Sequence, residues 1–140
     1  MKFDEIMIGQ TFDSRFYKIS KEEIMKFASQ FDPQYMHIDE EKASESIFNG
    51  IIASGLHTLS LSFKLWTEVS AWGQDVIAGT GINNLRFTKP VYPDDVLYIK
   101  AKVIEKKEKK DSGEVTLLLI TCKNDGVKVL TTEISALVAK

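Results

Sequence analysis

An acidic residue and an imidazole stand close together in the first third of the chain. Asp32 and His37 are five positions apart, and Pro33 lies between them. A carboxylate and an imidazole that converge on one point can hold a water molecule and exchange protons with it. Because proline disfavours helix in the residue before it, we expect an irregular loop from Asp32 to His37. The alternative for His37 is a structural imidazole bonded to a backbone carbonyl.

A glycine at the start of an apolar helix is the third candidate. Gly55 precedes a segment whose hydrophobic residues recur at helical spacing as far as Trp66. An amide at a helix N-terminus has no partner inside the helix and lies at the positive end of its dipole, so it can hold an oxyanion developing on a thioester carbonyl. Close backbone packing is the alternative role for the glycine. Ser54 is expected to cap this helix.

The composition is ordinary for a globular protein. The chain has 140 residues, 44% of them hydrophobic and 27% charged, which fits one domain over residues 1–140. Its net charge is −2, and no block of basic residues beyond 105–110 argues for nucleic acid. Cys122 is the one cysteine, so no internal disulfide is expected and a reducing cytoplasm is favoured. The N-terminus lacks the apolar run of a signal peptide. The most apolar window, residues 48–66, is interrupted by polar residues and predicts a buried helix, not a membrane span.

The pattern predicts helices first and strands afterwards. A strand is expected over residues 11–19, a helix from the capping box at Ser20 to about Phe31, a second short helix capped by Asp39, and the apolar helix from Ser54. Later strands are expected over residues 75–89, 96–106, 115–123 and 127–138, joined by hairpin loops. This is an α+β plan in which an antiparallel sheet wraps around a buried helix. A second copy would cover the sheet edge, so we expect a homodimer or a higher even oligomer.

These segments together resemble the MaoC-like, (R)-specific enoyl-CoA hydratases and 3-hydroxyacyl dehydratases of the hot-dog superfamily. That motif has Asp, four residues, His, a second Asp two later, an alanine, and an Ile-Ala/Val-x-Gly helix start. This chain has Asp32, His37, Asp39, Ala43 and Gly55 in that order. Its later Arg-Phe-Thr-Lys-Pro-Val-Tyr-Pro-Asp-Asp segment is similar to the family's Arg-Phe-x-x-Pro-Val-x-Pro-Gly-Asp turn. The resemblance spans nearly the whole chain and implies a hot-dog fold with a long central helix.

The resemblance implies a hydro-lyase that hydrates trans-2-enoyl thioesters or dehydrates (R)-3-hydroxyacyl thioesters. Asp32 and His37 would hold the water that adds to C3, with His37 as the base toward that water and Asp32 exchanging the proton at C2. The Gly55 amide would polarise the thioester carbonyl. Neither a metal nor a redox cofactor is implied, since the substrate is carried on coenzyme A or acyl carrier protein. The acyl-pantetheine arm would lie in a tunnel near the dimer interface.

Further residues are candidates for substrate contact: Gln34, Tyr35, Ser54, His57, Arg86 and Lys89. Gln34 and Tyr35 stand where the resembling hydratases have Asn-Pro, and Gln34 is expected to replace the hydrogen bonds of the asparagine. Tyr35 is a candidate gate of the pocket and His57 a candidate lining residue. Arg86 and Lys89 would meet a phosphate of coenzyme A, although solvated charges at a sheet edge are the simpler interpretation.

Two other functions remain open for this chain. Hot-dog thioesterases commonly place a catalytic acid within the central helix, but this helix carries none before Glu68. A non-catalytic acyl-thioester-binding protein would keep the fold and lose the chemistry. The presence of Asp32, His37 and Gly55 favours hydration over both.

Overall fold

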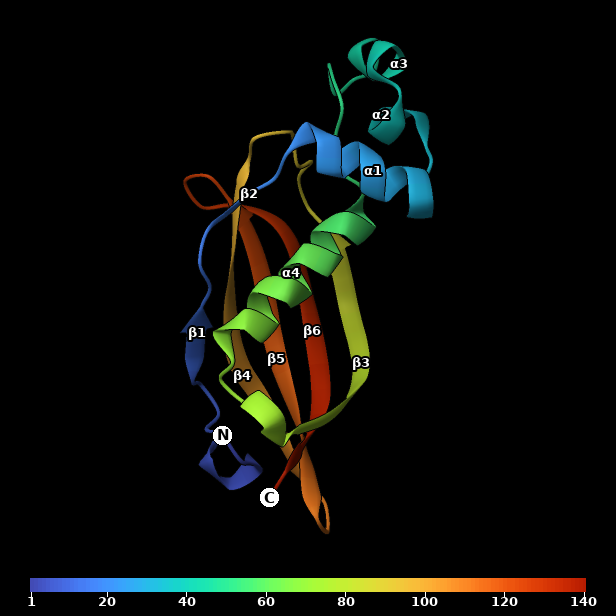
Figure 1. The fold of residues 1–140 in the computed structure, drawn as a ribbon. Coiled ribbons are helices and arrows are strands. Elements are labelled where there is room, and N and C mark those ends of the chain that lie inside the picture. Colours follow the sequence, from blue (N-terminus) through green and yellow to red (C-terminus); the bar gives the residue numbers. More distant parts are fainter.

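One curved antiparallel sheet wraps around one long helix in the computed structural model, which describes residues 1–140 (Figure 1). The helices are α1 (Lys21–Phe31), α2 (Tyr35–Ile38), α3 (Glu40–Ser44) and α4 (Gly55–Val69), with 3-10 turns at η1 (Phe3–Glu5) and η2 (Gly73–Asp75). The strands are β1 (Thr11–Asp13), β2 (Tyr17–Lys18), β3 (Val76–Phe87), β4 (Val96–Glu108), β5 (Ser112–Lys123) and β6 (Val127–Ala139). The predicted α+β plan is confirmed.

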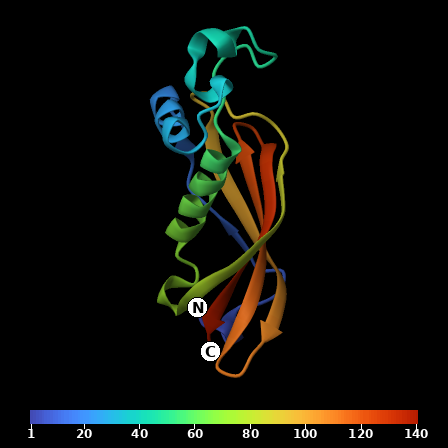
Figure 2. The same cartoon turned by 90° about the vertical axis from the view of Figure 1, so that its right-hand side faces the viewer.

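The strand order is β1-β4-β5-β6-β3, and β2 also pairs with β4. Consecutive hairpins place β4, β5 and β6 side by side, whereas β3 pairs with β6 alone and so forms an edge of the sheet. Helix α4 lies across the concave side of the sheet, as the view in Figure 2 makes clear. Both chain termini lie near the end of the molecule where α4 finishes (Figure 1).

The strand predicted over residues 11–19 is interrupted, and this prediction is wrong between β1 and β2. At the break, the hydroxyl of Ser14 accepts a hydrogen bond from the Ile99 amide at 2.8 Å, while the Ser14 amide donates to the Ile99 carbonyl. A side-chain oxygen therefore takes the place of a backbone carbonyl in the ladder. Local competition of this kind is common for serine and ends regular pairing.

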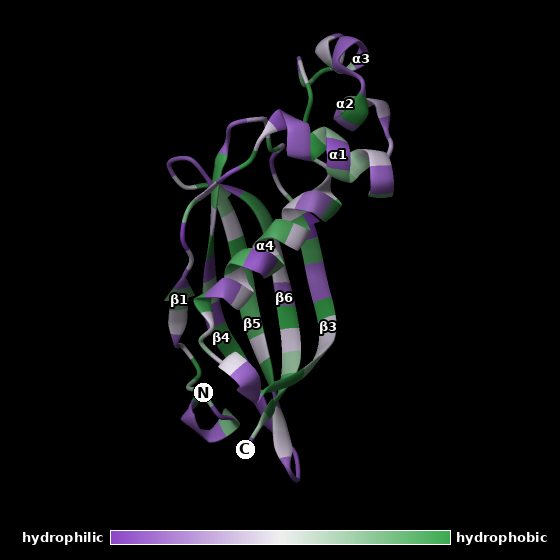
Figure 3. Ribbon diagram, in the orientation of Figure 1, coloured by the Kyte–Doolittle hydropathy of each residue, from purple (hydrophilic) through white to green (hydrophobic).

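Helix α4 is held by hydrophobic packing against the sheet. Its buried residues include Leu61, Leu65 and Trp66, and Leu65 is only 1% exposed. Leu65 and Trp66 pack in one cluster with buried strand residues that include Ile99 and Leu117. Hydrophobic bands recur along β5 and β6 beneath the helix in Figure 3. Burial of one helix face on the inner face of the sheet is what keeps α4 in place.

The three shorter helices lie together over the N-terminal end of α4 (Figures 1 and 2). The predicted capping box begins α1, since the Ser20 hydroxyl accepts from the Glu23 amide at 3.1 Å and the Glu23 carboxylate accepts from the Ser20 amide at 3.2 Å. Helix α1 ends before Asp32, whose φ of −155° and ψ of 68° lie outside the helical region, as Pro33 requires. Asp39 caps α3 as predicted.

The expected irregular loop from Asp32 to His37 is wrong over its second half. Residues 35–38 form helix α2, because the His37 amide donates to the Gln34 carbonyl at 3.0 Å and the Asp39 amide donates to the Tyr35 carbonyl at 2.9 Å. The Ile52 amide also donates to the Met36 carbonyl at 3.1 Å, which ties α2 to the segment before α4. His37 is therefore fixed in a helical turn.

A second buried cluster supports this end of the molecule. It joins α1, α3, the approach to α4 and the ends of β4 and β6, and includes Ile24, Ala43, Ile51, Leu97 and Val129. Because these residues come from separate elements, the cluster fixes those elements relative to one another. The single cysteine, Cys122, is buried at 5% exposure and belongs to the core. None of the helices is long and apolar enough to cross a membrane.

Candidate active site

Asp32 and His37 face each other where α1 gives way to α2. The Nε2 atom of His37 lies 3.4 Å from Oδ2 of Asp32, and the two side chains are 8% and 18% exposed. The structure thus brings together the acid and the imidazole that the sequence singles out. At this separation the carboxylate and the imidazole interact electrostatically.

The orientation of the His37 ring is set by its other nitrogen. Nδ1 lies 2.6 Å from the carbonyl oxygen of Ile52. Because a carbonyl can only accept, Nδ1 carries the proton, and in the neutral ring Nε2 is then the nitrogen with the free electron pair. The carbonyl bond proposed as the structural alternative does exist. It leaves Nε2 available as a base directed toward Asp32.

Both oxygens of the Asp32 carboxylate accept hydrogen bonds. The Ser54 hydroxyl donates to Oδ2 at 2.7 Å, and the Gln34 side-chain amide donates to Oδ1 at 2.7 Å. These two bonds, in that order, lower the pKa of Asp32, and the nearby His37 adds a smaller effect in the same direction while partial burial opposes it. Asp32 is therefore a carboxylate at neutral pH, since hydrogen bonds to the charged form stabilise it.

Gly55 is the first residue of α4, and its amide donates to no group of the chain. The neighbouring donors are occupied: the Leu56 amide donates to the Ser54 hydroxyl at 3.2 Å, and the His57 and Thr58 amides both donate to the Ser54 carbonyl. The free N–H of Gly55 thus lies at the positive end of a 15-residue helix. It is suited to bind a negatively charged oxygen.

A pocket of about 300 Å³ lies beside His37 and Gly55. His37, Gly55 and Thr58 line it together with apolar side chains that include Phe48 and Phe87. Asp32 is not among the lining residues, so it acts on the pocket through His37. His37 and Gly55 thus border one partly apolar space.

Only one of the remaining predicted contact residues lines this pocket. Lys89 lines the pocket, whereas Arg86 does not. Tyr35 is 47% exposed and does not line the pocket, so the structure gives no support to a gating role. Ser54 and Gln34 contact Asp32 and likewise do not line the pocket.

His57 points away from the pocket, against the expectation that it lines it. Its ring stacks on the Phe27 ring of α1 with centroids 4.5 Å apart and an interplanar angle of 8°. Burial lowers the pKa of His57, and its buried Nδ1 has no hydrogen-bond partner. Two residues correspond to about 200° of helical rotation, so His57 lies on the side of α4 opposite Gly55.

Of the 12 lining residues only His37, Gly55 and Lys89 were predicted, and Thr58 and Phe87 are among those that were missed. Thr58 lies three residues after Gly55 and hence on the same face of α4, so helical spacing was the signal that could have identified it. Phe87 ends β3, and no feature of the sequence places its ring next to Gly55. That contact depends on how the edge strand meets the helix.

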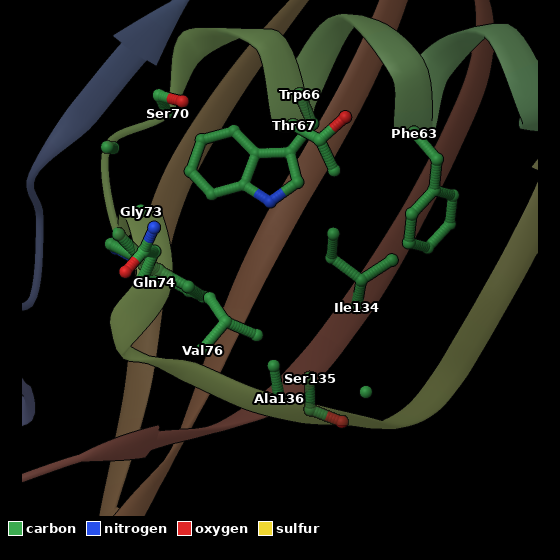
Figure 4. Close-up of a pocket in the computed structure, with 13 residues that line it drawn as sticks. Phe63, Trp66, Thr67, Ser70, Gly73, Gln74, Val76, Ile134, Ser135 and Ala136 are labelled. Carbon is green, nitrogen blue, oxygen red and sulfur yellow. The ribbon is translucent and has the colours of Figure 1, made fainter.

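A second pocket, of about 390 Å³, lies at the opposite end of α4. Figure 4 shows the side chains of Phe63 and Trp66 pointing from α4 toward Ile134 of β6, with Val76 of β3 on the other side. Trp66 lies about 16 Å along the helix axis from Gly55, given a rise of about 1.5 Å per residue. The pocket contains none of Asp32, His37 or Gly55. Trp66 and Trp72 both line it and belong to the buried core.

The site can move one proton and stabilise one negative charge. Nε2 of His37 can take a proton, the Asp32 carboxylate would stabilise the imidazolium that forms, and the Gly55 amide can donate to an oxyanion. The structure contains no group of three or more histidine, cysteine or acidic side chains arranged to hold a metal ion.

Comparison with known proteins gives consistent matches. A model of the MaoC-like domain matches residues 4–124. The chain is 52% identical to the uncharacterized protein YdeM of Bacillus subtilis over the full length of both. The structure of a MaoC-like dehydratase from Rhodospirillum rubrum superposes with a TM-score of 0.92 at 30% identity, covering 100% of this chain and 97% of that one. The (R)-hydratase PhaJ1 of Pseudomonas aeruginosa gives a TM-score of 0.77 at 26% identity over 99% of this chain and 86% of that one. The sheet wrapped around α4 is thus the hot-dog fold.

Proposed function

Because this chain belongs to the MaoC-like domain family, we propose that it is a hydro-lyase acting on trans-2-enoyl or (R)-3-hydroxyacyl thioesters. The observation that carries the proposal is that His37 and Gly55 line one pocket, and that the Gly55 amide has no partner in the chain. The likeness of the whole chain to an (R)-hydratase and to a MaoC-like dehydratase supports the reaction type. The thioester would be carried on coenzyme A or acyl carrier protein.

In the hydration direction, His37 removes a proton from water through Nε2 as the water oxygen bonds to C3 of the enoyl thioester. The electrons of the double bond move toward the thioester carbonyl, whose oxygen becomes negative and accepts a hydrogen bond from Gly55. C2 then takes a proton, which completes the 3-hydroxyacyl product. Dehydration follows the same steps in reverse.

We assign the C2 proton to His37, not to Asp32 as the family resemblance first implied. The pKa of Asp32 is lowered by hydrogen bonds from Ser54 and Gln34, so at neutral pH this residue holds no proton to give. His37, by contrast, gains a proton in the first step and can return it in the second. The Asp32 carboxylate, 3.4 Å from Nε2, stabilises the imidazolium between the two steps.

A thioesterase is the less favoured alternative. The only acidic residue of α4 is Glu68 in its last turn, and its carboxylate accepts two hydrogen bonds from Arg15 at 2.9 and 3.2 Å on the exposed surface. Glu68 is therefore engaged far from the pocket. No other acid of α4 is available to activate water for thioester hydrolysis.

We also propose a homodimer that pairs through β3. This strand uses only one edge, toward β6, and exposes large hydrophobic residues: Val76 (40%), Ile77 (57%), Ile82 (46%) and Phe87 (54%). A long, apolar and unpaired edge is usually covered, since it would otherwise invite aggregation. Sedimentation of the purified protein would give the mass of the assembly.

The test of the reaction is optical. Hydration of crotonyl-CoA removes the conjugated enoyl thioester and bleaches its absorbance, whereas thioester hydrolysis releases free thiol that a thiol-reactive dye detects. Cys122 is 5% exposed and so contributes little background to the dye. We expect bleaching without thiol release. Enoyl-CoA esters of increasing length would define the acyl preference.

Thiol release without bleaching would instead identify a thioesterase. If no ester from short to long acyl chains gave either signal, and enoyl acyl carrier protein also failed, the hydro-lyase proposal would be wrong. Binding of the esters without turnover would then favour the non-catalytic acyl-thioester-binding alternative.

A further inference from the structure

Ser54 links the two halves of the site. It is the residue before α4, is 1% exposed, and lies next to Gly55, whereas Asp32 belongs to the end of α1. Its hydroxyl accepts a hydrogen bond from the Leu56 amide at 3.2 Å, which is the predicted helix cap. Capping uses the oxygen as an acceptor and leaves the hydroxyl proton free for another partner.

That proton goes to Asp32. The Ser54 hydroxyl donates to Oδ2 at 2.7 Å, and Oδ2 is the same oxygen that lies 3.4 Å from Nε2 of His37. The other oxygen, Oδ1, is held by Gln34, whose side chain is exposed and can exchange its bond with solvent. Ser54 is thus the buried contact that decides which oxygen faces the imidazole.

We infer that Ser54 is a positioning residue of this site: one hydroxyl caps α4 beside the free Gly55 amide and fixes the Asp32 oxygen that faces His37. The inference rests on the proposed function and assigns Ser54 a role other than substrate contact. Through this hydroxyl the position of the Gly55 amide is coupled to that of the Asp32–His37 pair, because a shift of the start of α4 would move both.

The charge on Asp32 depends on the same contact. The Ser54 hydrogen bond is the largest cause of the lowered pKa of Asp32, ahead of Gln34. Without it the carboxylate would hold a proton at higher pH than in the wild type. A protonated Asp32 cannot stabilise an imidazolium at His37, so the acid side of the activity profile should move to higher pH.

The experiment compares Ser54→Ala and Ser54→Gly with Ser62→Ala. Glycine is a good helix cap, so Ser54→Gly removes the hydroxyl with little loss of helix stability if the alanine variant folds poorly. Ser62 is a matched control because it is fully buried on the same helix and its hydroxyl bonds to Thr121 and to the Thr58 carbonyl, not to Asp32. Each protein is assayed with crotonyl-CoA across the pH range.

We expect both Ser54 variants to lose about 10- to 100-fold in kcat, the range typical of losing a hydrogen bond to a charged group. The acid limb of their kcat/KM profile should move to higher pH, while Ser62→Ala keeps the wild-type profile even if it is less stable. A loss of activity with an unmoved acid limb in both Ser54 variants would mean that Ser54 is only a structural cap and would overturn the inference.

A second readout does not require activity. The side-chain carboxyl ¹³C resonance of Asp32 can be followed by NMR during a pH titration of each protein. Its midpoint should rise in Ser54→Ala and Ser54→Gly and stay in place in Ser62→Ala, and an unchanged midpoint in the Ser54 variants would refute the inference. If the wild type proved inactive while the midpoint still rose, the positioning contact would stand and the proposed function alone would fall.

Discussion

The ring of Phe87 lies directly against Gly55, so that a β-carbon on residue 55 would come within 2.6 Å of the ring. Three ring carbons of Phe87 would lie within 2.8 Å of that position, closer than real side-chain contacts. The glycine is therefore required by the close approach of a side chain from β3 and not by a left-handed backbone. This contact sets the distance between the edge strand and the free amide of the site.

We expect Gly55→Ala to reduce hydration of crotonyl-CoA by about 10²-fold, of the order of losing an oxyanion donor. The alanine still has an N–H, so the loss would come from the clash with Phe87, which displaces either the ring or the start of α4. The double variant Gly55→Ala/Phe87→Leu makes room for the new methyl group and should recover part of the rate. The measurement is kcat for the three proteins.

Gly79→Ala serves as the control for this experiment. A β-carbon at Gly79 would meet no atom within 4 Å, and its backbone φ is not positive. It should keep the wild-type rate. Equal losses in Gly55→Ala with and without Phe87→Leu would show that the contact with the ring is not the cause.

His37→Ala and Asp32→Asn should lower kcat by about 10²- to 10⁴-fold, the range for removal of a general acid–base group. The two variants are separated by chemical rescue. Added imidazole can carry the proton that His37 no longer carries, so it should restore part of the rate of His37→Ala. It should not help Asp32→Asn, where the proton carrier is present and its stabilising charge is missing.

Circular dichroism of both variants verifies that the fold is kept. Wild-type rates in both would exclude the assigned roles. If imidazole restored the rate of Asp32→Asn and not that of His37→Ala, Asp32 and not His37 would be the residue that transfers the proton.

Features governed by neighbours in sequence were predictable. The hydroxyl of Ser20 begins α1, Pro33 ends it, and Ser54 begins α4, since caps and proline act within a few residues. Helix α2 was missed because it is only four residues long and is tied to the Ile52 segment by contacts across 15 residues. Isolated helices of that length do not form on local propensity.

The site was predictable in its residue types and not in its internal contacts. The bond from Ser54 to Asp32 spans 22 residues and exists only because α1 docks on the start of α4. The position of His57 could have been deduced, because residues two apart on a helix face different sides. Its polar side chain suggested a pocket, but its ring is used as an apolar surface against Phe27.

The buried His57 should make stability depend on pH. Burial lowers its pKa in the folded protein, with a small opposing effect from Glu23, while in the unfolded chain it titrates near 6.5. As the pH falls below that value, the unfolded chain binds a proton that the folded protein does not accept. The free energy of unfolding should therefore decrease as the pH drops from 7.5 to 5.5.

Urea denaturation of the wild type and of His57→Leu over that pH range is the measurement. The leucine keeps an apolar contact with Phe27 and cannot titrate, so its stability should fall less steeply. Ser60→Ala, a change on the exposed side of the same helix, should keep the wild-type dependence. Parallel curves for wild type and His57→Leu would exclude His57 as the source.

Lys89 should bind the phosphates of the coenzyme A carrier, because it is the one basic residue that lines the pocket with His37 and Gly55. Exposed charge pairs contribute about 0.2–1 kcal/mol, so Lys89→Gln should raise KM for crotonyl-CoA about 2- to 5-fold at low salt and leave kcat unchanged. The corresponding N-acetylcysteamine thioester lacks the phosphates, and its KM should not change. Arg86→Gln, which alters a neighbouring charge outside the pocket lining, should have a smaller effect on either substrate. If Lys89→Gln raised KM equally for both thioesters, its effect would come from the shape of the pocket and not from phosphate binding.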